Sequence, residues 1–235
     1  MPVTLRIGTS GYSYKEWKGS FYPNDLPVKR MLRYYGEHFS TVESNSTFRR
    51  LPTDVAIKAW ANEVPADFKF ALKAPQQITH FRRLRDVEEP LSKLIEVTSV
   101  LKNRLGPILF QLPPNFKKDV PRLEAFLKLI PRRTQVAFEF RNGSWFDDEV
   151  FSLLKSRNVA ICLAEAEETL TTPFIATADF GYVRLRMEEY SDAELDRWTT
   201  RIGLQKWTEA YIFFKHEDEA NGPGFAKRMM ARAKD

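Results

Sequence analysis

Polar and charged side chains stand at the ends of several short apolar runs in this sequence. They are Glu43 and Asn45, Lys73, Gln111, Glu139 and Arg141, Arg184 and Arg186, and Lys215. Carboxylates serve as general acids or bases, whereas guanidinium and ammonium groups bind phosphate or carboxylate. In this group two carboxylates are set against five cations. The surplus of positive charge predicts a site for an anion.

The apolar runs that carry these residues predict eight strands. They cover residues 5–10, 41–48, 68–75, 107–113, 136–141, 159–166, 182–187 and 210–216. Helical patterns lie between them, including 91–105 with a stop at Gly106, a helix that Thr53 caps, one that Pro121 opens, and a capping box from Ser191 and Glu194.

The repeated strand and helix predict an α/β fold, a single (β/α)8 barrel of the TIM type with parallel strands and outer helices. The whole chain, residues 1–235, is expected to form one domain. A doubly wound open sheet is the alternative. That fold normally carries a G-x-G-x-x-G fingerprint after its first strand, and the segment Gly8-Thr9-Ser10-Gly11 does not match it.

Alternation along the strands sorts the side chains into two faces. The large apolar set is predicted to face the helices, and it comprises Phe68, Phe70, Leu72, Ile108, Phe110, Leu112, Val136, Phe138, Phe140, Val183, Leu185 and Met187. The charged group then points into the barrel, near the carboxyl ends of the strands, where barrel enzymes place their chemistry. Strand eight is ambiguous, because both of its faces are apolar.

Aromatic residues follow the same strand ends. Tyr12 and Trp17 come after strand one, Phe48 ends strand two, and Trp145 comes after strand five. Loop aromatics beside basic groups can stack on a base or a sugar ring, so these four are candidate substrate-binding residues. Ordinary packing of loops over the top of the barrel is the competing interpretation.

Composition narrows the class of protein. The chain has 36 Lys and Arg against 31 Asp and Glu, a net charge of +5, and this mild excess favours an anionic partner. The single cysteine, Cys162, excludes an intramolecular disulfide framework and an all-cysteine metal site. No apolar stretch approaches the roughly 18 residues of a membrane span, and the first residues do not resemble a signal peptide. The cytoplasm is therefore the expected compartment, with no membrane partner.

Ordered motifs run through nearly the whole chain. They are Gly8-Thr9-Ser10-Gly11-Tyr12 with Trp17, Phe21-Tyr22-Pro23, Glu43-Ser44-Asn45-Ser46-Thr47-Phe48, Phe70-Ala71-Leu72-Lys73-Ala74-Pro75 with Ile78-Thr79-His80, Gln111-Leu112-Pro113-Pro114, Glu139-Phe140-Arg141 with Ser144-Trp145, and Ala178-Asp179-Phe180 before Val183-Arg184-Leu185. Together they resemble the domain of unknown function 72 family, also called YecE-like proteins. The resemblance implies a TIM-type barrel with a pocket at its carboxyl face, and it implies no particular reaction.

The chain departs from the pattern of that family at three places. Arg186-Met187 stand where the family usually has His-Gly after its strand-seven arginine, and Lys215-His216 replace paired asparagines at the end of the last strand. Arg49 stands where many members have tyrosine. These departures add cations at the predicted site, which strengthens the case for an anion and weakens any role for a family-wide histidine.

The first functional hypothesis is an enzyme that acts on a small phosphorylated or carboxylated substrate. Glu139 would be the acid/base, oriented by Arg141, and Glu43 would be a second acid/base or would hold a substrate hydroxyl. Lys73, Arg184 and Arg186 would clamp the anion, and Lys73 could also form a Schiff base. Two inward carboxylates also fit a glycosidase, if their separation suits that reaction.

Three other hypotheses stay open at this point. Nucleic-acid binding or phosphodiester processing would use the basic runs Arg49-Arg50, Arg82-Arg83-Leu84-Arg85, Lys117-Lys118 and Arg132-Arg133. No cofactor is predicted, although Glu43, Glu139 and His216 could hold Mg²⁺ or Mn²⁺ against the repulsion of the neighbouring cations. A closed internal network of ion pairs, which only holds the barrel together, would leave no anion site.

Overall fold

The computed structural model describes residues 2–165, 170–215 and 221–233. It contains eight parallel strands, which form one sheet. The strands are β1 (Thr4–Thr9), β2 (Thr41–Ser44), β3 (Lys69–Lys73), β4 (Leu105–Gln111), β5 (Val136–Glu139), β6 (Ala160–Ala164), β7 (Phe180–Leu185) and β8 (Glu209–Phe214).

The sheet curves into a nearly closed barrel. Its strand order is β1-β8-β7-β6-β5-β4-β3-β2, and the two ends meet where Ser10 bridges Glu43 and the amide of Gly11 donates to the carbonyl of Glu43 at 2.8 Å. Glycine permits this close approach, since a Cβ on Gly8 would lie 2.1 Å from the carbonyl oxygen of Thr41. The predicted (β/α)8 architecture is confirmed.

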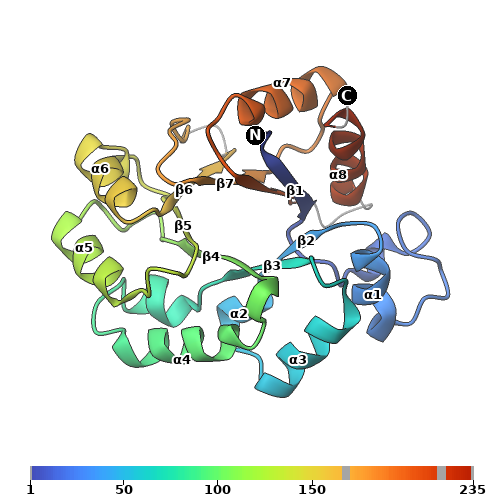
Figure 1. The fold of residues 1–235 in the computed structure, drawn as a ribbon, viewed down its shortest axis with the longest axis horizontal. Helices are drawn as coiled ribbons and strands as arrows, with labels where there is room; N and C mark the ends of the chain where they lie inside the picture. Colours follow the sequence, from blue (N-terminus) through green and yellow to red (C-terminus); the bar gives the residue numbers. More distant parts are fainter. Residues whose placement is uncertain (1, 166–169, 216–220, 234–235) are drawn as a thin grey trace.

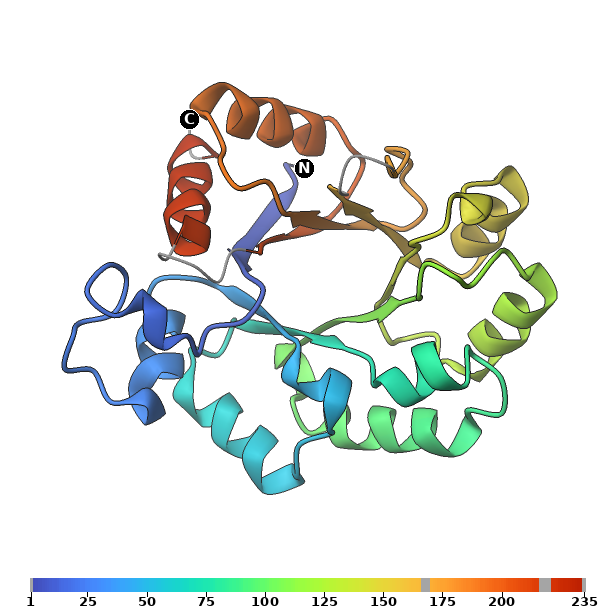
Figure 2. The ribbon, with the colours of Figure 1, turned by 180° about the vertical axis from the view of Figure 1, so that it is seen from behind.

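Helices surround the ring of strands on its outer side (Figures 1 and 2). The longer ones are α1 (Met31–Gly36), α3 (Asp54–Glu63), α4 (Glu88–Ser99), α5 (Val120–Leu129), α6 (Asp148–Ser156), α7 (Asp192–Gly203) and α8 (Asn221–Arg232). Short turns of helix are α2 (Ser46–Arg49), η1 (Lys15–Trp17), η2 (Val28–Arg30), η3 (Gln77–Phe81), η4 (Lys102–Arg104) and η5 (Gly143–Trp145). Between β6 and β7, the described residues 165 and 170–179 form no helix.

Local signals place several of these helices correctly. The side chain of Thr53 accepts a hydrogen bond from the amide of Ala56 and caps α3, and Ser191 and Glu194 form the predicted capping box of α7. The predicted helix end at Gly106 is wrong, because Gly106 lies inside β4. A Cβ there would come within 3.2 Å of the backbone of Phe70, so this glycine serves strand packing instead of ending a helix.

The core has two layers that follow the alternation of the strands. The predicted outward residues pack under the helices, and all of them except Met187 are buried in that layer. The second layer fills the barrel with Ala71, Leu109, Ala137, Ala160, Cys162, Phe180, Tyr182, Tyr211 and Phe213. Strand eight is thereby resolved, with Tyr211 and Phe213 inside. Met187 lies beyond the end of β7, where alternation stops applying, and 42% of it is exposed.

Aromatic packing fills the barrel up to the level of the strand ends, so an open cavity is expected only beyond them.

None of the helices in the described ranges is long and apolar enough to cross a membrane.

The closure between β1 and β2 should depend on the missing side chain of Gly8. A Cβ there would also lie 2.9 Å from the hydroxyl of Tyr35, so Gly8→Ala should lower the free energy of unfolding by about 1–3 kcal/mol or more through overpacking. Gly203→Ala is the matched control, because a Cβ there meets no heavy atom within 4 Å, and it should be neutral or stabilise by up to about 1 kcal/mol. Urea unfolding measures both; equal midpoints for the two variants would contradict the packing argument.

Candidate functional site

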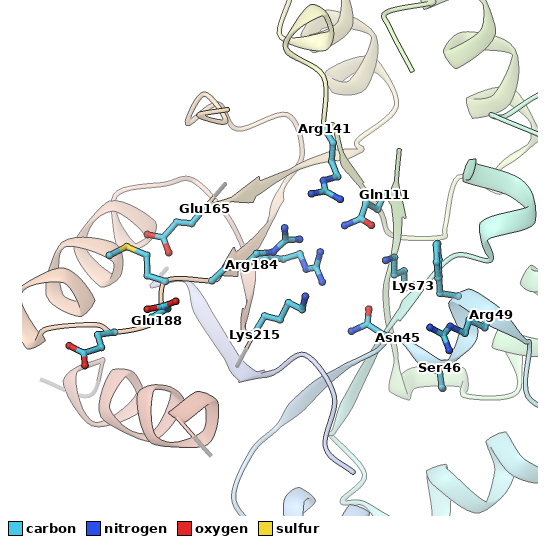
Figure 3. Close-up of a pocket in the computed structure, with 14 residues that line it drawn as sticks. Asn45, Ser46, Arg49, Lys73, Gln111, Arg141, Glu165, Arg184, Glu188 and Lys215 are labelled. Atoms are coloured by element: carbon cyan, nitrogen blue, oxygen red, sulfur yellow. The ribbon is translucent and has the colours of Figure 1, made fainter. Parts of the chain in front are cut away.

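A cavity of about 1390 Å³ opens at the carboxyl ends of the strands. Figure 3 shows the side chains that line it, which come from Asn45, Ser46, Phe48, Arg49, Lys73, Gln111, Arg141, Glu165, Arg184, Arg186, Met187, Glu188, Glu189 and Lys215. The set includes most of the residues that the sequence predicts for the site. The strand ends therefore bring these residues together as alternation requires.

A buried arginine forms the floor of this cavity. Arg184, from β7, donates through Nη2 to Glu43 Oε1 at 2.8 Å and through Nη1 to Glu139 Oε2 at 2.5 Å. Arg186 adds a bond from Nη2 to Glu139 Oε1 at 2.8 Å. Arg184 is 2% exposed and the two carboxylates are equally buried. We call Arg184, Glu43 and Glu139 the charged hub.

Neutral donors complete the bonding of the two carboxylates. The hydroxyls of Ser10 and Tyr182 donate to Glu43 at 2.6 Å and 2.7 Å, respectively. The side-chain amide of Gln111 donates to Glu139 Oε1 at 2.9 Å. Ser10 and Tyr182 are not among the residues predicted from the sequence, although Tyr182 shares the inward face of β7 with Arg184 and Ser10 directly follows β1.

The electrostatics of the hub make Glu139 a weak base. Burial alone would raise the pKa of this carboxyl, but the charges of Arg184 and Arg186 and the hydrogen bond from Gln111 outweigh burial and hold the pKa at about 2. A carboxylate with so low a pKa is far from the value that suits proton transfer at neutral pH. Its orienting partners are Arg184, Arg186 and Gln111, whereas the sequence predicts Arg141 for that role.

Lys73 occupies the end of β3 and is held on one side by an aromatic ring. Its Nζ lies 4.0 Å from the centroid of the Phe48 ring. Burial lowers the pKa of Lys73, the charge of Arg184 lowers it further, and the carboxylates of the hub oppose this, so that the pKa is about 8. Within the described part of the chain, this ammonium group forms no ion pair.

The outer walls of the cavity carry opposite charges. Arg49, Arg141 and Lys215 line it beside Lys73, whereas Glu165 and Glu188 lie on the other side of the cavity (Figure 3). The carboxylate of Glu165 accepts hydrogen bonds from Tyr190 and from Trp198 Nε1.

Three carboxylates of the lining, Glu165, Glu188 and Glu189, are not among the residues predicted from the sequence. Glu165 directly follows β6, and Glu188 and Glu189 lie beyond the end of β7, so strand alternation does not predict that they face the cavity.

The predicted aromatic rim needs correction. Trp17 and Trp145 are both 0% exposed; Trp17 packs on Tyr22, and the indole of Trp145 donates to the carbonyl of Phe116 at 2.7 Å. Tyr12 is half-buried against the Tyr35 ring. Of the four predicted aromatic residues, only Phe48 belongs to the described lining of the cavity. Helical turns η1 and η5 bring the two indoles into the core.

The carboxylates considered for a metal ion are engaged by arginine. Glu43 and Glu139 share the guanidinium of Arg184, and His216 lies outside the described residues. Among the residues that the structure describes, no group of three His, Cys, Asp or Glu side chains is arranged to hold a metal ion.

Comparison with known proteins places the chain in a family. The profile of the family described as "Protein of unknown function DUF72" matches residues 6–235. This chain belongs to the DUF72 family. It is 29% identical to the UPF0759 protein YunF of Bacillus subtilis over 231 residues, which cover 92% of this chain and 79% of that protein.

A second curated relative, the UPF0759 protein YecE of Escherichia coli, is 31% identical over 116 residues. That match spans 49% of this chain and 43% of the relative, less than half of either. A crystal structure of a DUF72 family protein from Thermotoga maritima has a TM-score of 0.81 at 25% identity, and the match covers 97% of this chain and 99% of that one. The barrel is therefore shared along almost the full length of both chains.

Residues of the DUF72 motifs supply the charged hub and the donors Ser10 and Gln111. Of the cations that line the cavity, Lys73 and Arg141 also belong to the motifs, whereas Arg49, Arg186 and Lys215 stand where the sequence departs from the expected family pattern. The lining therefore combines residues of both kinds.

The pH dependence of stability should report the ion pairs of Glu139. Its pKa falls from an ordinary 4.5 to about 2 on folding, so this stabilisation, about 3 kcal/mol, is complete above pH 4.5 and is lost as the pH falls toward 2. Near neutral pH, the free energy of unfolding of Glu139→Gln should therefore be lower than that of the wild type. This difference should shrink as the pH falls from 4.5 toward 2. Urea unfolding at stepped pH values measures the effect.

Glu124→Gln provides the control, since Glu124 forms an exposed pair with Lys128, and exposed pairs contribute little to stability. A deficit of Glu139→Gln that stays constant from pH 7 to pH 3 would contradict the assignment of the low pKa to Glu139.

Proposed function

We propose that the cavity binds the anionic group of a small phosphorylated or carboxylated substrate, on which this protein acts as an enzyme. The observation that carries the proposal is a set of four cations, Arg49, Lys73, Arg141 and Lys215, that line one cavity and form no ion pair with any described residue. Guanidinium forks and ammonium groups are the side chains that bind phosphate and carboxylate most strongly.

The charged hub explains why these cations remain available. Arg184 and Arg186 are offset by Glu43 and Glu139, so the positive charge that faces a ligand comes from the outer residues. The Nε atoms of Arg184 and Arg186 are buried and have no partner among the described residues. An unsatisfied buried donor costs about 1–3 kcal/mol, and an oxygen atom of a bound anion would remove part of that cost.

The carboxylates on one side of the cavity indicate how a substrate would be oriented in it. Glu165, Glu188 and Glu189 would repel an anion, so the anionic group belongs on the side of Lys73 and Arg141. Carboxylates accept hydrogen bonds from hydroxyl and amino groups. The rest of the substrate, extending toward Glu165, is accordingly expected to carry such donors.

One observation favours a second candidate, the binding of single-stranded nucleic acid. Phe81 is 72% exposed and borders a groove of about 560 Å³ that shares Phe48 and Arg49 with the cavity and also contains Arg50 and Lys93. Exposed aromatic rings stack on bases, and the basic side chains would contact phosphates. Binding of an oligonucleotide that weakens steeply with salt would favour this candidate, and the absence of binding at low salt would exclude it.

Phosphate should stabilise the protein through Arg141. At constant ionic strength, replacing chloride by phosphate should raise the melting temperature of the wild type, because the ligand binds the folded state only. Arg141→Met should remove most of this rise. Thermal unfolding monitored by circular dichroism measures it.

Arg133→Met is the matched control. Arg133 is an exposed arginine that precedes β5, at the opposite end of the barrel, so its removal should leave the rise intact. No response of the wild type to phosphate, or an equal loss in the two variants, would contradict the proposal.

A further inference from the structure

Lys73 differs from the other cations of the cavity in how it is held. It is half-buried at the end of β3, whereas Lys215, the other lysine of the lining, is exposed. The Phe48 ring covers one side of its Nζ, and no described residue forms a hydrogen bond or an ion pair with that nitrogen. Arginine cannot lose its proton in a protein, whereas lysine can. Lys73 is therefore the half-buried cation of the described lining that can present a free amine.

The backbone around Lys73 is fixed on both sides. The hydroxyl of Thr47 donates to the carbonyl of Lys73 at 2.6 Å, which ties α2 and its Phe48 to the end of β3. The amide of Ala74 donates to the carbonyl of Leu109 on β4 at 2.9 Å. A reactive group on a rigid element is positioned more accurately than one on a loop. The backbone from which the Lys73 side chain extends is therefore fixed, and the contact with the Phe48 ring places its amine.

We infer that Lys73 is a nucleophile that forms an imine with the carbonyl carbon of an anionic aldehyde or ketone bound in the cavity. The inference rests on the proposed function and narrows its substrate class to phosphorylated or carboxylated carbonyl compounds. Arg141 and Lys215, which line the same cavity, would bind the anionic group. Lysine amines form such imines with carbonyl substrates when their environment favours the free base.

The reaction balances without any other reagent. The lone pair of the Lys73 nitrogen attacks the carbonyl carbon, and the π electrons of the C=O bond move to oxygen, which takes up a proton to give a carbinolamine. The nitrogen then loses one proton, and its lone pair forms the C=N bond as the hydroxyl, protonated by solvent, leaves as water. The resulting iminium loses its remaining N–H proton to solvent and becomes the imine. The amine and the carbonyl compound thus give an imine and one molecule of water.

The electrostatics of the site agree with this role. Burial and Arg184 lower the pKa of Lys73 to about 8, against the opposing effect of Glu43 and Glu139. At a pH of about 8, half of such a lysine is the free amine, whereas an ordinary lysine, with a pKa near 10.4, is almost entirely protonated. The cation–π contact with Phe48 favours the charged form, which suits the positively charged iminium that protonation of the imine produces.

Reductive trapping tests the inference on the wild-type protein. The protein is incubated with glyceraldehyde 3-phosphate or with glyceraldehyde in the presence of sodium cyanoborohydride, which reduces an imine to a stable secondary amine, and the labelled lysines are located by peptide mass spectrometry. We expect Lys73 to be labelled about tenfold faster by the phosphorylated probe, a difference of about 1.4 kcal/mol that one charged hydrogen bond to the phosphate can supply. Lys215 is the internal control. Absent labelling of Lys73, or equal labelling of the two lysines, would overturn the inference.

The variant Lys73→Arg separates this inference from the proposed function. Arginine keeps the positive charge but forms no such imine, so the label should disappear while phosphate still raises the melting temperature. If the wild type shows the phosphate effect but no label at Lys73, the imine is excluded and the proposed function stands. If both probes label Lys73 equally and phosphate has no effect, the anionic substrate class is overturned and the reactive amine remains.

Discussion

The interior of this barrel holds two buried carboxylates, Glu43 and Glu139, whose charges are offset by the guanidinium groups of Arg184 and Arg186. Arg184 connects a carboxylate from β2 with one from β5, and all three side chains are removed from water. A buried ion loses several kcal/mol of hydration, which only close partners and further hydrogen bonds can offset. Ser10, Tyr182 and Gln111 supply those bonds. The closure between β1 and β2 brings Ser10 to Glu43, and Tyr182 reaches the same carboxylate from the inner face of β7. The ion pairs themselves form the floor of the cavity.

Because the charges at the floor of the cavity offset one another, the charged side chains of its walls determine which groups the cavity can bind. Since Arg184 and Arg186 are matched by carboxylates, the substrate binding that we propose depends on the cations above them and on the acidic residues opposite. The cavity therefore has a positive side and a negative side, so a substrate with an anionic group at one end would bind in one orientation. Lys73 lies next to the hub, where burial and the charge of Arg184 lower the pKa of its amine.

Alternation along strands was sufficient to predict that Glu43, Glu139 and Arg184 face into the barrel, and it failed where strands end. Glu43, Glu139 and Arg184 lie inside regular strands, so their direction followed from parity alone. Trp17 and Trp145 lie in helical turns, and no pattern in the sequence tells whether such a turn directs an indole outward or into the core. The ion pairs that Arg184 and Arg186 form with Glu43 and Glu139 could not be predicted from composition either, because they depend on which strands face each other across the barrel.

The free energy of unfolding of a set of hub variants tests the dependence on charge balance most directly. Arg184→Met alone leaves Glu43 and Glu139 buried without their shared partner, and it should lose about 3–5 kcal/mol. Adding Glu43→Gln and Glu139→Gln to the same chain removes the stranded charges and should restore most of that loss. A single variant as stable as the wild type, or a triple variant less stable than the single one, would contradict the account.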